Sequence, residues 1–259
     1  MDIHKPKPWR GWREFLKEYL IIVVGVLTAL GAEAVVENLH WREKVARAEE
    51  AEKPELQAFY YNAYERALVD PCIGRRIDAL EAALLADGPW VPAKPMLHES
   101  WSLPFVIQTP NRGWRDQVWR TLVADGTASH LPPARERLYA DVMGFAEGIE
   151  ARNGVEANEN AGLNVLLKPA SLSRDQRGEL IARLEQERAR SWLLALNSRQ
   201  LMPKLEQLFT PDRKALERKL LTNSATYRAC YQQGYLPPGS PAPPPQTDEA
   251  RRALGAPAS

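Results

Sequence analysis

A single long apolar run near the N-terminus constrains this chain more than any other feature. It lies in residues 17–44, KEYLIIVVGVLTALGAEAVVENLHWREK, and the 14 residues from Tyr19 to Ala32 carry no charge. That is fewer than the ~20 residues that cross a bilayer core. The 22 residues from Phe15 to Val36 make about 33 Å of helix, however, and their charges can reach the head groups because they lie about a turn from either end. These charges are Lys17, Glu18 and Glu33.

Aromatic residues flank the run on both sides, as the aromatic belts of membrane-spanning helices do. They are Trp9, Trp12 and Tyr19 before the run and Trp41 after it. The interval from Trp12 to Trp41 is about 43 Å of helix, against ~40–45 Å for a bilayer with its interfaces. The spacing therefore predicts a transmembrane helix over residues 15–36, with the lipid bilayer as its first partner.

A cleaved secretory signal is the main alternative. The basic start, the apolar stretch and Ala32-Glu33-Ala34 resemble the three parts of such a signal, and cleavage near Ala34 would leave a secreted protein. Residues 33–53 contain no Gly or Pro, however, and form a strong helix-favouring sequence, whereas a cleavage site should be extended. We therefore expect an uncleaved anchor followed by a helical stalk over residues 37–54.

The distribution of Lys and Arg predicts the orientation of the anchor. Residues 4–18 contain five of them and residues 33–47 contain three, and the richer side usually stays in the cytoplasm. Residues 1–14 are therefore expected to form a cytoplasmic stub. The chain beyond the span is expected outside the cytoplasm, which in a bacterium is the periplasm.

The two cysteines agree with that placement. In a cytosolic protein Cys72 and Cys230 would most often be small core residues, whereas outside the cytoplasm an isolated pair more often forms a disulfide. We predict this bond. The sequence holds no C-x-x-C motif and no Cys/His cluster, so we expect neither a metal site nor a cofactor.

Composition indicates an all-α fold. Leu, Ala, Glu and Arg dominate, and alternating β-branched segments are nearly absent. With 44% hydrophobic residues the chain can bury a core, and we expect a bundle of about five or six helices over residues 55–236. Residues 237–259 are rich in proline and are expected to form a disordered tail. The net charge of +1 argues against a nucleic-acid partner.

Proline, glycine and serine predict where the helices of the domain begin and end. Pro54 is expected to end or kink the stalk, a new helix is expected after it, and Asp70-Pro71 is expected to stop that helix. Residues 90–113 carry four prolines without a period and predict a long irregular connection. Gly126 is expected to end a helix in the left-handed conformation, and a helix is expected to begin at Pro132-Pro133. Ser173 or Ser171 is expected to be the N-cap of a later helix.

The anchor and the segment WRTLVADGTASHLPP together resemble a family of uncharacterised bacterial single-pass inner-membrane proteins. The anchor is similar to a sequence motif of the form E-F-x-I-I-V-x-G-V-L-I-A-L in those proteins. Further along the chain, Trp119, Gly126 and Leu131-Pro132 are similar to their W…G…LP pattern. The resemblance implies an inner-membrane anchor and a periplasmic helical domain. It implies no catalytic residues.

The irregular connection also suggests a small-molecule binder or hydrolase-like enzyme. It places His98, Glu99, Ser100 and Trp101 side by side. Adjacent residues in an extended loop point in different directions, however, and a nucleophile and its base normally come from separate segments. The candidates for an acid–base site are His98, Glu99, Arg112, Arg115 and His130. The simpler interpretation makes them solvated charges at loops and helix ends, with an aromatic plug on the bundle.

The leading hypothesis is therefore a non-enzymatic, membrane-tethered interaction or scaffold module. Its extracytoplasmic bundle would bind another envelope protein or a second copy of itself. Gly25-x-x-x-Ala29 offers a small-residue face on which two spans could pair.

Overall fold

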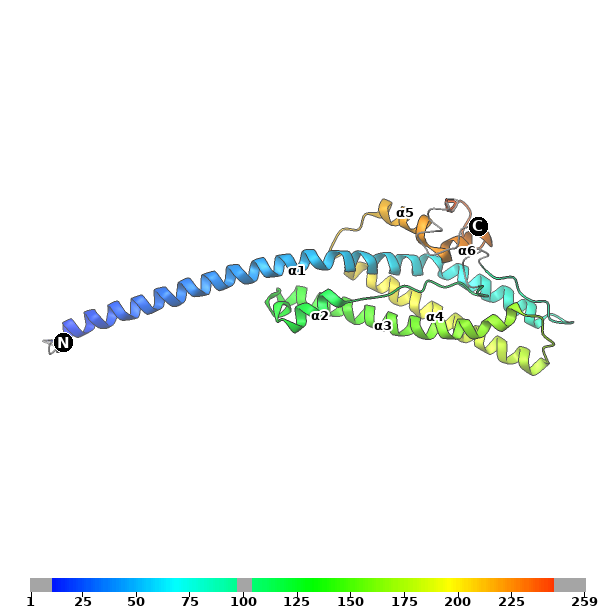
Figure 1. The fold of residues 1–259 in the computed structure, drawn as a ribbon, viewed down its shortest axis with the longest axis horizontal. Helices are drawn as coiled ribbons and strands as arrows, with labels where there is room; N and C mark the ends of the chain where they lie inside the picture. Colours follow the sequence, from blue (N-terminus) through cyan, green and yellow to red (C-terminus); the bar gives the residue numbers. More distant parts are fainter. Residues whose placement is uncertain (1–10, 97–103, 245–259) are drawn as a thin grey trace, which may run out of the picture.

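The computed structural model describes residues 11–96 and 104–244. Over these residues the chain is helical and contains no strand, so the predicted all-α class is confirmed. In Figure 1 the first half of α1 extends alone, and its second half lies between α3 and α4 on one side and α5 and α6 on the other. The elements are α1 (Trp12–Leu85), α2 (Gln117–Ala124), the 3-10 turn η1 (Thr127–His130), α3 (Pro133–Leu163), the 3-10 turn η2 (Asn164–Leu167), α4 (Arg174–Leu205), α5 (Arg213–Asn223) and α6 (Ala225–Gln232).

The helix α1 is continuous over 74 residues, about 110 Å, with Pro54 and Pro71 inside it. The predictions of a new helix after Pro54 and of a stop at Asp70-Pro71 are therefore wrong. A proline in a helix interior costs about 3 kcal/mol. Packing outweighs this cost, because neighbours of both prolines are buried, and each such side chain contributes about 1.5–3 kcal/mol. Leu56, Val69 and Ile73 are at most 1% exposed.

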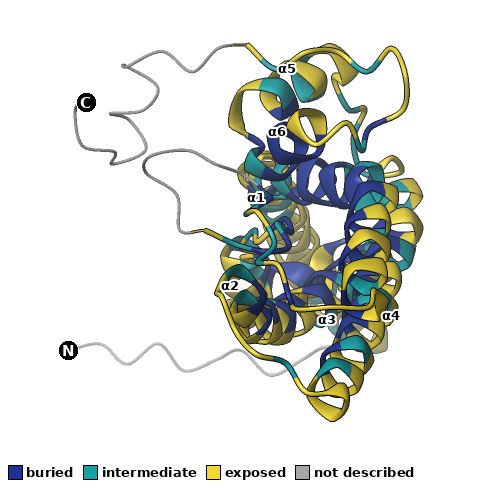
Figure 2. Cartoon of the chain, turned by 90° about the vertical axis from the view of Figure 1, so that its right-hand side faces the viewer, coloured by how far each residue is buried: buried dark blue, intermediate teal, exposed yellow. Residues whose placement is uncertain are grey.

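The core consists of two apolar clusters that follow each other along the bundle. In Figure 2 the residues coloured as buried gather where α1, α3 and α4 lie against one another. The proximal cluster, nearer the free half of α1, includes Phe59, Ala63, Trp114, Trp119, Tyr139, Val142, Ile149, Leu194 and Leu201. The distal cluster includes Val69, Ile73, Ile77, Met96, Ile107, Leu163, Leu180, Leu184 and Cys230.

Residues 86–116 contain no helix over their described part, in agreement with the predicted irregular connection. The Arg76 side chain holds this connection to α1, because it donates to the carbonyls of Val106 at 2.8 Å and Lys94 at 2.5 Å. Trp90 and Trp114 are buried, so aromatic rings of this segment do plug the bundle. The next helix, α2, begins at Gln117, directly after this connection.

Several helix ends lie where the sequence predicts them. Gly126 has φ 78°, in the left-handed region that favours glycine, and Pro133 is the first residue of α3. Ser173 caps α4 in a capping box with Gln176. A further boundary lies at Ser224, between α5 and α6, where the Ser224 hydroxyl accepts from the Tyr227 amide at 2.8 Å and so caps α6.

The start of the proline-rich segment runs without a helix along α6. The Tyr227 hydroxyl donates to the carbonyl of Pro241 at 2.9 Å, and Arg228 donates to the carbonyl of Pro244 at 3.0 Å. The remainder of the predicted tail, residues 245–259, lies outside the described residues.

Candidate functional site

The first half of α1 exposes apolar side chains around its whole circumference. It is the one helix in the described part of the chain that is long and apolar enough to cross a membrane. None of its most apolar window is buried, and Ile21 and Val36 are 71% and 67% exposed. A helix that is apolar on all sides is stable only when an apolar environment surrounds it. The chain therefore contains a candidate membrane span where the sequence predicts one.

The predicted belt residues occupy different surroundings. Trp12 and Tyr19 are 74% and 58% exposed, whereas Trp9 lies outside the described residues. Trp41 is half-buried, because its ring stacks on the ring of His130, with 3.6 Å between the centroids and 10° between the planes. The Lys44 ammonium lies 4.8 Å from the same indole. Trp41 thus joins the end of the candidate span to η1.

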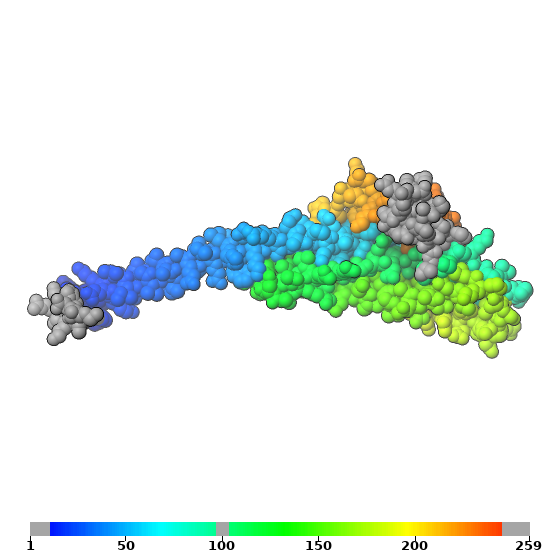
Figure 3. Space-filling view, viewed as in Figure 1, coloured from blue at the N-terminus to red at the C-terminus, as the bar shows by residue number. Residues whose placement is uncertain are grey.

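The base of the domain, formed by η1 and the start of α3, lies against α1 at the level of Trp41. Beyond this point α1 continues alone toward the N-terminus (Figure 3). Hydrogen bonds from the hydroxyl and the amide of Thr127 lower the pKa of Asp125 to about 2, and Lys44, which pairs with Asp125 at 3.1 Å, adds to the effect. Glu52 is fully buried in the same helix. Within the predicted stalk, residues 37–54, one face of α1 therefore contacts the domain from Trp41 onward, with Ala48 and Glu52 buried and most other side chains exposed.

A groove of about 730 Å³ lies between α1 and this base. Val45, Ala46 and Pro132 contribute apolar surface beside the Trp41 ring. The groove carries charges of both signs. Its lining residues are Ala34, Glu37, Asn38, Trp41, Arg42, Val45, Ala46, Glu49, His130, Pro132 and Arg135.

The residues proposed for an acid–base site do not come together where they are described. Arg112 forms an ion pair with Glu65 at 2.8 Å and donates to the Asn223 carbonyl at 2.9 Å, so it ties the irregular connection to α1 and α5. His130 contacts Trp41, which lies 24 residues before Glu65 on α1, about 36 Å along the helix.

The other candidates for an acid–base site give no contact that would form one. Arg115 is exposed. His98, Glu99, Ser100 and Trp101 lie outside the described residues. Among the described residues no three His, Cys, Asp or Glu side chains gather in a way that could hold a metal ion.

A buried polar layer, which the sequence analysis missed, separates the two apolar clusters. At its centre the Arg66 guanidinium donates to both carboxylate oxygens of Glu156, at 2.7 and 2.5 Å. Both side chains are at most 3% exposed. Arg66 also donates to the Pro110 carbonyl at 2.7 Å and to Asn153 at 3.2 Å. The layer therefore joins α1, α3 and the irregular connection.

Two buried carboxyl groups have strongly shifted proton affinities. Burial, together with the nearby Glu156 carboxylate, raises the pKa of Glu187 to about 8, although Arg190 donates to one of its oxygens at 2.8 Å. Burial raises the pKa of Glu52 to about 7, and the carboxylates of Glu55 and Asp116 add to the effect. Neither oxygen of Glu52 has a hydrogen-bond partner among the described residues.

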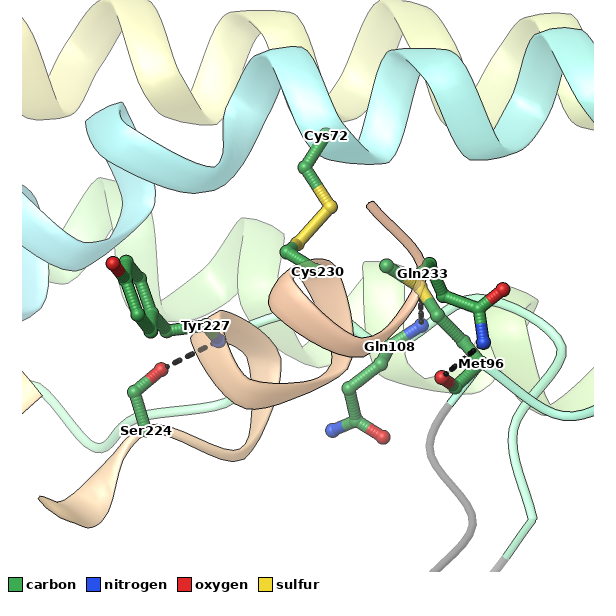
Figure 4. The surroundings of a disulfide bond; sticks show 7 residues. All are labelled: Cys72, Met96, Gln108, Ser224, Tyr227, Cys230 and Gln233. Carbon is green, nitrogen blue, oxygen red and sulfur yellow. Dashed lines mark hydrogen bonds between the residues drawn. A yellow bond between two sulfur atoms is a disulfide. The ribbon is translucent and has the colours of Figure 1, made fainter. Parts of the chain in front are cut away.

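A disulfide joins Cys72 of α1 to Cys230 of α6, as predicted (Figure 4). The Cα atoms are 5.9 Å apart, and both cysteines are at most 1% exposed. On the same side of the bundle Gln233 donates to the Met96 carbonyl at 3.0 Å. The bond therefore closes the distal cluster under α6.

No family model, curated protein or solved structure matches this chain. The helical fold, the candidate span and the geometry at its base therefore carry the functional argument.

Proposed function

We propose that the protein is a single-pass, membrane-anchored interaction or scaffold module. Its helical domain stands on the non-cytoplasmic side of the membrane, in the periplasm of a bacterial cell. One observation carries this proposal: α1 is both the candidate span and the central helix of the domain core.

The continuity of α1 has a mechanical consequence. Ala48 is the first buried residue of α1, 12 residues beyond Val36, which is about 18 Å along the helix. Between them Trp41 already contacts η1. Because a continuous helix has no flexible linker, the domain is held at a fixed height and angle close to the bilayer, as suits a scaffold.

The domain also exposes apolar side chains that a partner protein could cover. On α4, Trp192 is 55% exposed and the adjacent Leu193 is 36% exposed. Exposed aromatic residues are enriched where proteins bind one another. We propose that this face of α4 contacts an envelope protein or a second copy of the chain.

A photo-crosslinking amino acid at position 192 tests the module in intact membranes. Gln200 is unsuitable as a control because it lies seven positions from Leu193 on the same face of α4, so the exposed Glu147 on α3 provides the control position. We expect a discrete crosslinked species from position 192 and a weaker one from position 147. A chain that stays monomeric from both positions would contradict the scaffold function.

A further inference from the structure

The groove at the base of the domain lies at the height where the bilayer surface should be. Its lining begins at Ala34, inside the candidate span, and continues to Glu49 in the domain. Trp41, the outer of the two tryptophans whose spacing fits a bilayer with its interfaces, forms part of the wall. The groove is therefore continuous at one end with the exposed apolar surface of α1.

The charges of the groove are only partly satisfied by the protein. Arg135 and Glu49 pair with each other across it. Arg42 and Glu37 are exposed, and neither forms an ion pair with any residue that the structure describes. One free guanidinium and one free carboxylate thus face the same groove.

This pairing of charges matches a zwitterionic head group. A guanidinium binds phosphate through two parallel hydrogen bonds, and a carboxylate accepts from an ammonium group. Anionic lipids are instead recruited by clusters of four to eight Lys and Arg residues. The groove has no such cluster, because Glu37 and Glu49 balance Arg42 and Arg135.

The apolar wall has the complementary shape for the rest of a lipid. Trp41, Val45 and Pro132 line the groove beside the charges. Leu30 and Leu27 precede Ala34 by four and seven positions, so they lie on the same face of α1, and they are 56% and 63% exposed. Acyl chains that follow this surface would lie in the hydrocarbon region while the glycerol end reached the groove.

We propose that the groove binds one zwitterionic phospholipid of the ethanolamine type, with its phosphate on Arg42 and its ammonium group at Glu37. The bound lipid seats the base of the domain on the membrane surface. This inference rests on the membrane placement given in the proposed function.

Photolabelling of the full chain in vesicles tests the site. Phosphatidylethanolamine and phosphatidylglycerol probes, each with a diazirine near the glycerol end of one acyl chain, are used in separate vesicles. Mass spectrometry then gives the ratio of adducts on residues 130–135 to adducts on residues 15–36. We expect Arg42→Gln to lower this ratio about tenfold with the ethanolamine probe, as for the loss of a hydrogen bond between two charged groups.

Arg137 supplies the matched control. It is exposed on α3, does not line the groove, and forms no ion pair with the residues described, so Arg137→Gln should leave the ratio unchanged. Two results would overturn the lipid site. One is an unchanged adduct ratio in Arg42→Gln, and the other is an adduct ratio in the unmodified chain that is as high with the phosphatidylglycerol probe as with the phosphatidylethanolamine probe. A complete lack of adducts on residues 15–36 would instead overturn the membrane anchor, and the lipid site with it.

Discussion

The ring of Trp41 stacks on the ring of His130, with 3.6 Å between their centroids. This contact changes the interpretation of both residues. Trp41 was expected only as a belt residue against lipid, and His130 as a possible acid or base. Instead the pair joins the candidate span to the base of the domain, so the two parts should move as one body.

The stack makes a stability prediction. Replacing Trp41 or His130 by Leu should each lower the free energy of unfolding by about 1 kcal/mol, and the double variant should lose less than the sum, because aromatic pairs contribute about 0.5–1.5 kcal/mol beyond their burial. Thermal unfolding of the full chain in detergent, followed by circular dichroism, measures the four states of this cycle. Strict additivity would show that the rings are adjacent without stabilising each other.

The buried ion pair makes a second prediction. Arg66→Met should destabilise the domain by about 3–5 kcal/mol, because it leaves the Glu156 carboxylate buried without its cation. The double variant Arg66→Met and Glu156→Met should recover much of that loss, since no unpaired charge remains. Denaturant unfolding provides the values. A double variant less stable than Arg66→Met would contradict the explanation by charge burial.

Glu52 makes a prediction about pH. Its pKa is about 7 in the folded chain and near 4.5 when unfolded, so the folded state binds more protons between these values. The contribution of Glu52 to stability should therefore be most favourable below about pH 4.5, fall as the pH rises through about 7, and then level off. Glu52→Gln should remove that dependence and stabilise the domain at pH 8 by roughly 2 kcal/mol.

The control for Glu52 is the exposed Glu50 on the same helix. Glu50→Gln should leave the pH profile of thermal unfolding unchanged. If Glu52→Gln and the unmodified chain lose stability in parallel from pH 5 to pH 8, the carboxyl group is not buried as described.

The disulfide makes a fourth prediction. Replacing Cys72 and Cys230 by Ser should lower the free energy of unfolding by about 2–5 kcal/mol, because the bond restricts the unfolded chain over 158 positions. A strong reductant should lower the unfolding temperature of the unmodified chain and leave that of the serine variant unchanged. Equal stability with and without the bond would show that packing alone holds α6 on α1.

Local signals in the sequence predicted much of this fold. Gly126, Pro133 and Ser173 end or begin elements where expected, because their backbone preferences act over a few residues. The prediction that helices end at Pro54 and Pro71 was wrong, because the packing that keeps α1 continuous comes from side chains far away in the sequence.

The sequence pattern predicts part of the buried polar layer: it shows that a polar residue is buried but not which residues surround it. Glu187 follows Leu184 by three positions and precedes Leu194 by seven, so a helical period places it on the same buried face. The period shows that a carboxyl group is buried but not what surrounds it. Arg66 and Glu156 lie 90 positions apart, and only the packing of α1 against α3 brings them together.

Both the scaffold function and the lipid site require that α1 remains whole, as an anchor that continues into the domain. The most direct test of this requirement is the intact mass and N-terminal sequence of the chain recovered from washed membranes. We expect a membrane-bound chain that retains residues 15–36. A soluble chain beginning at Val35, after cleavage at Ala32-Glu33-Ala34, would contradict it.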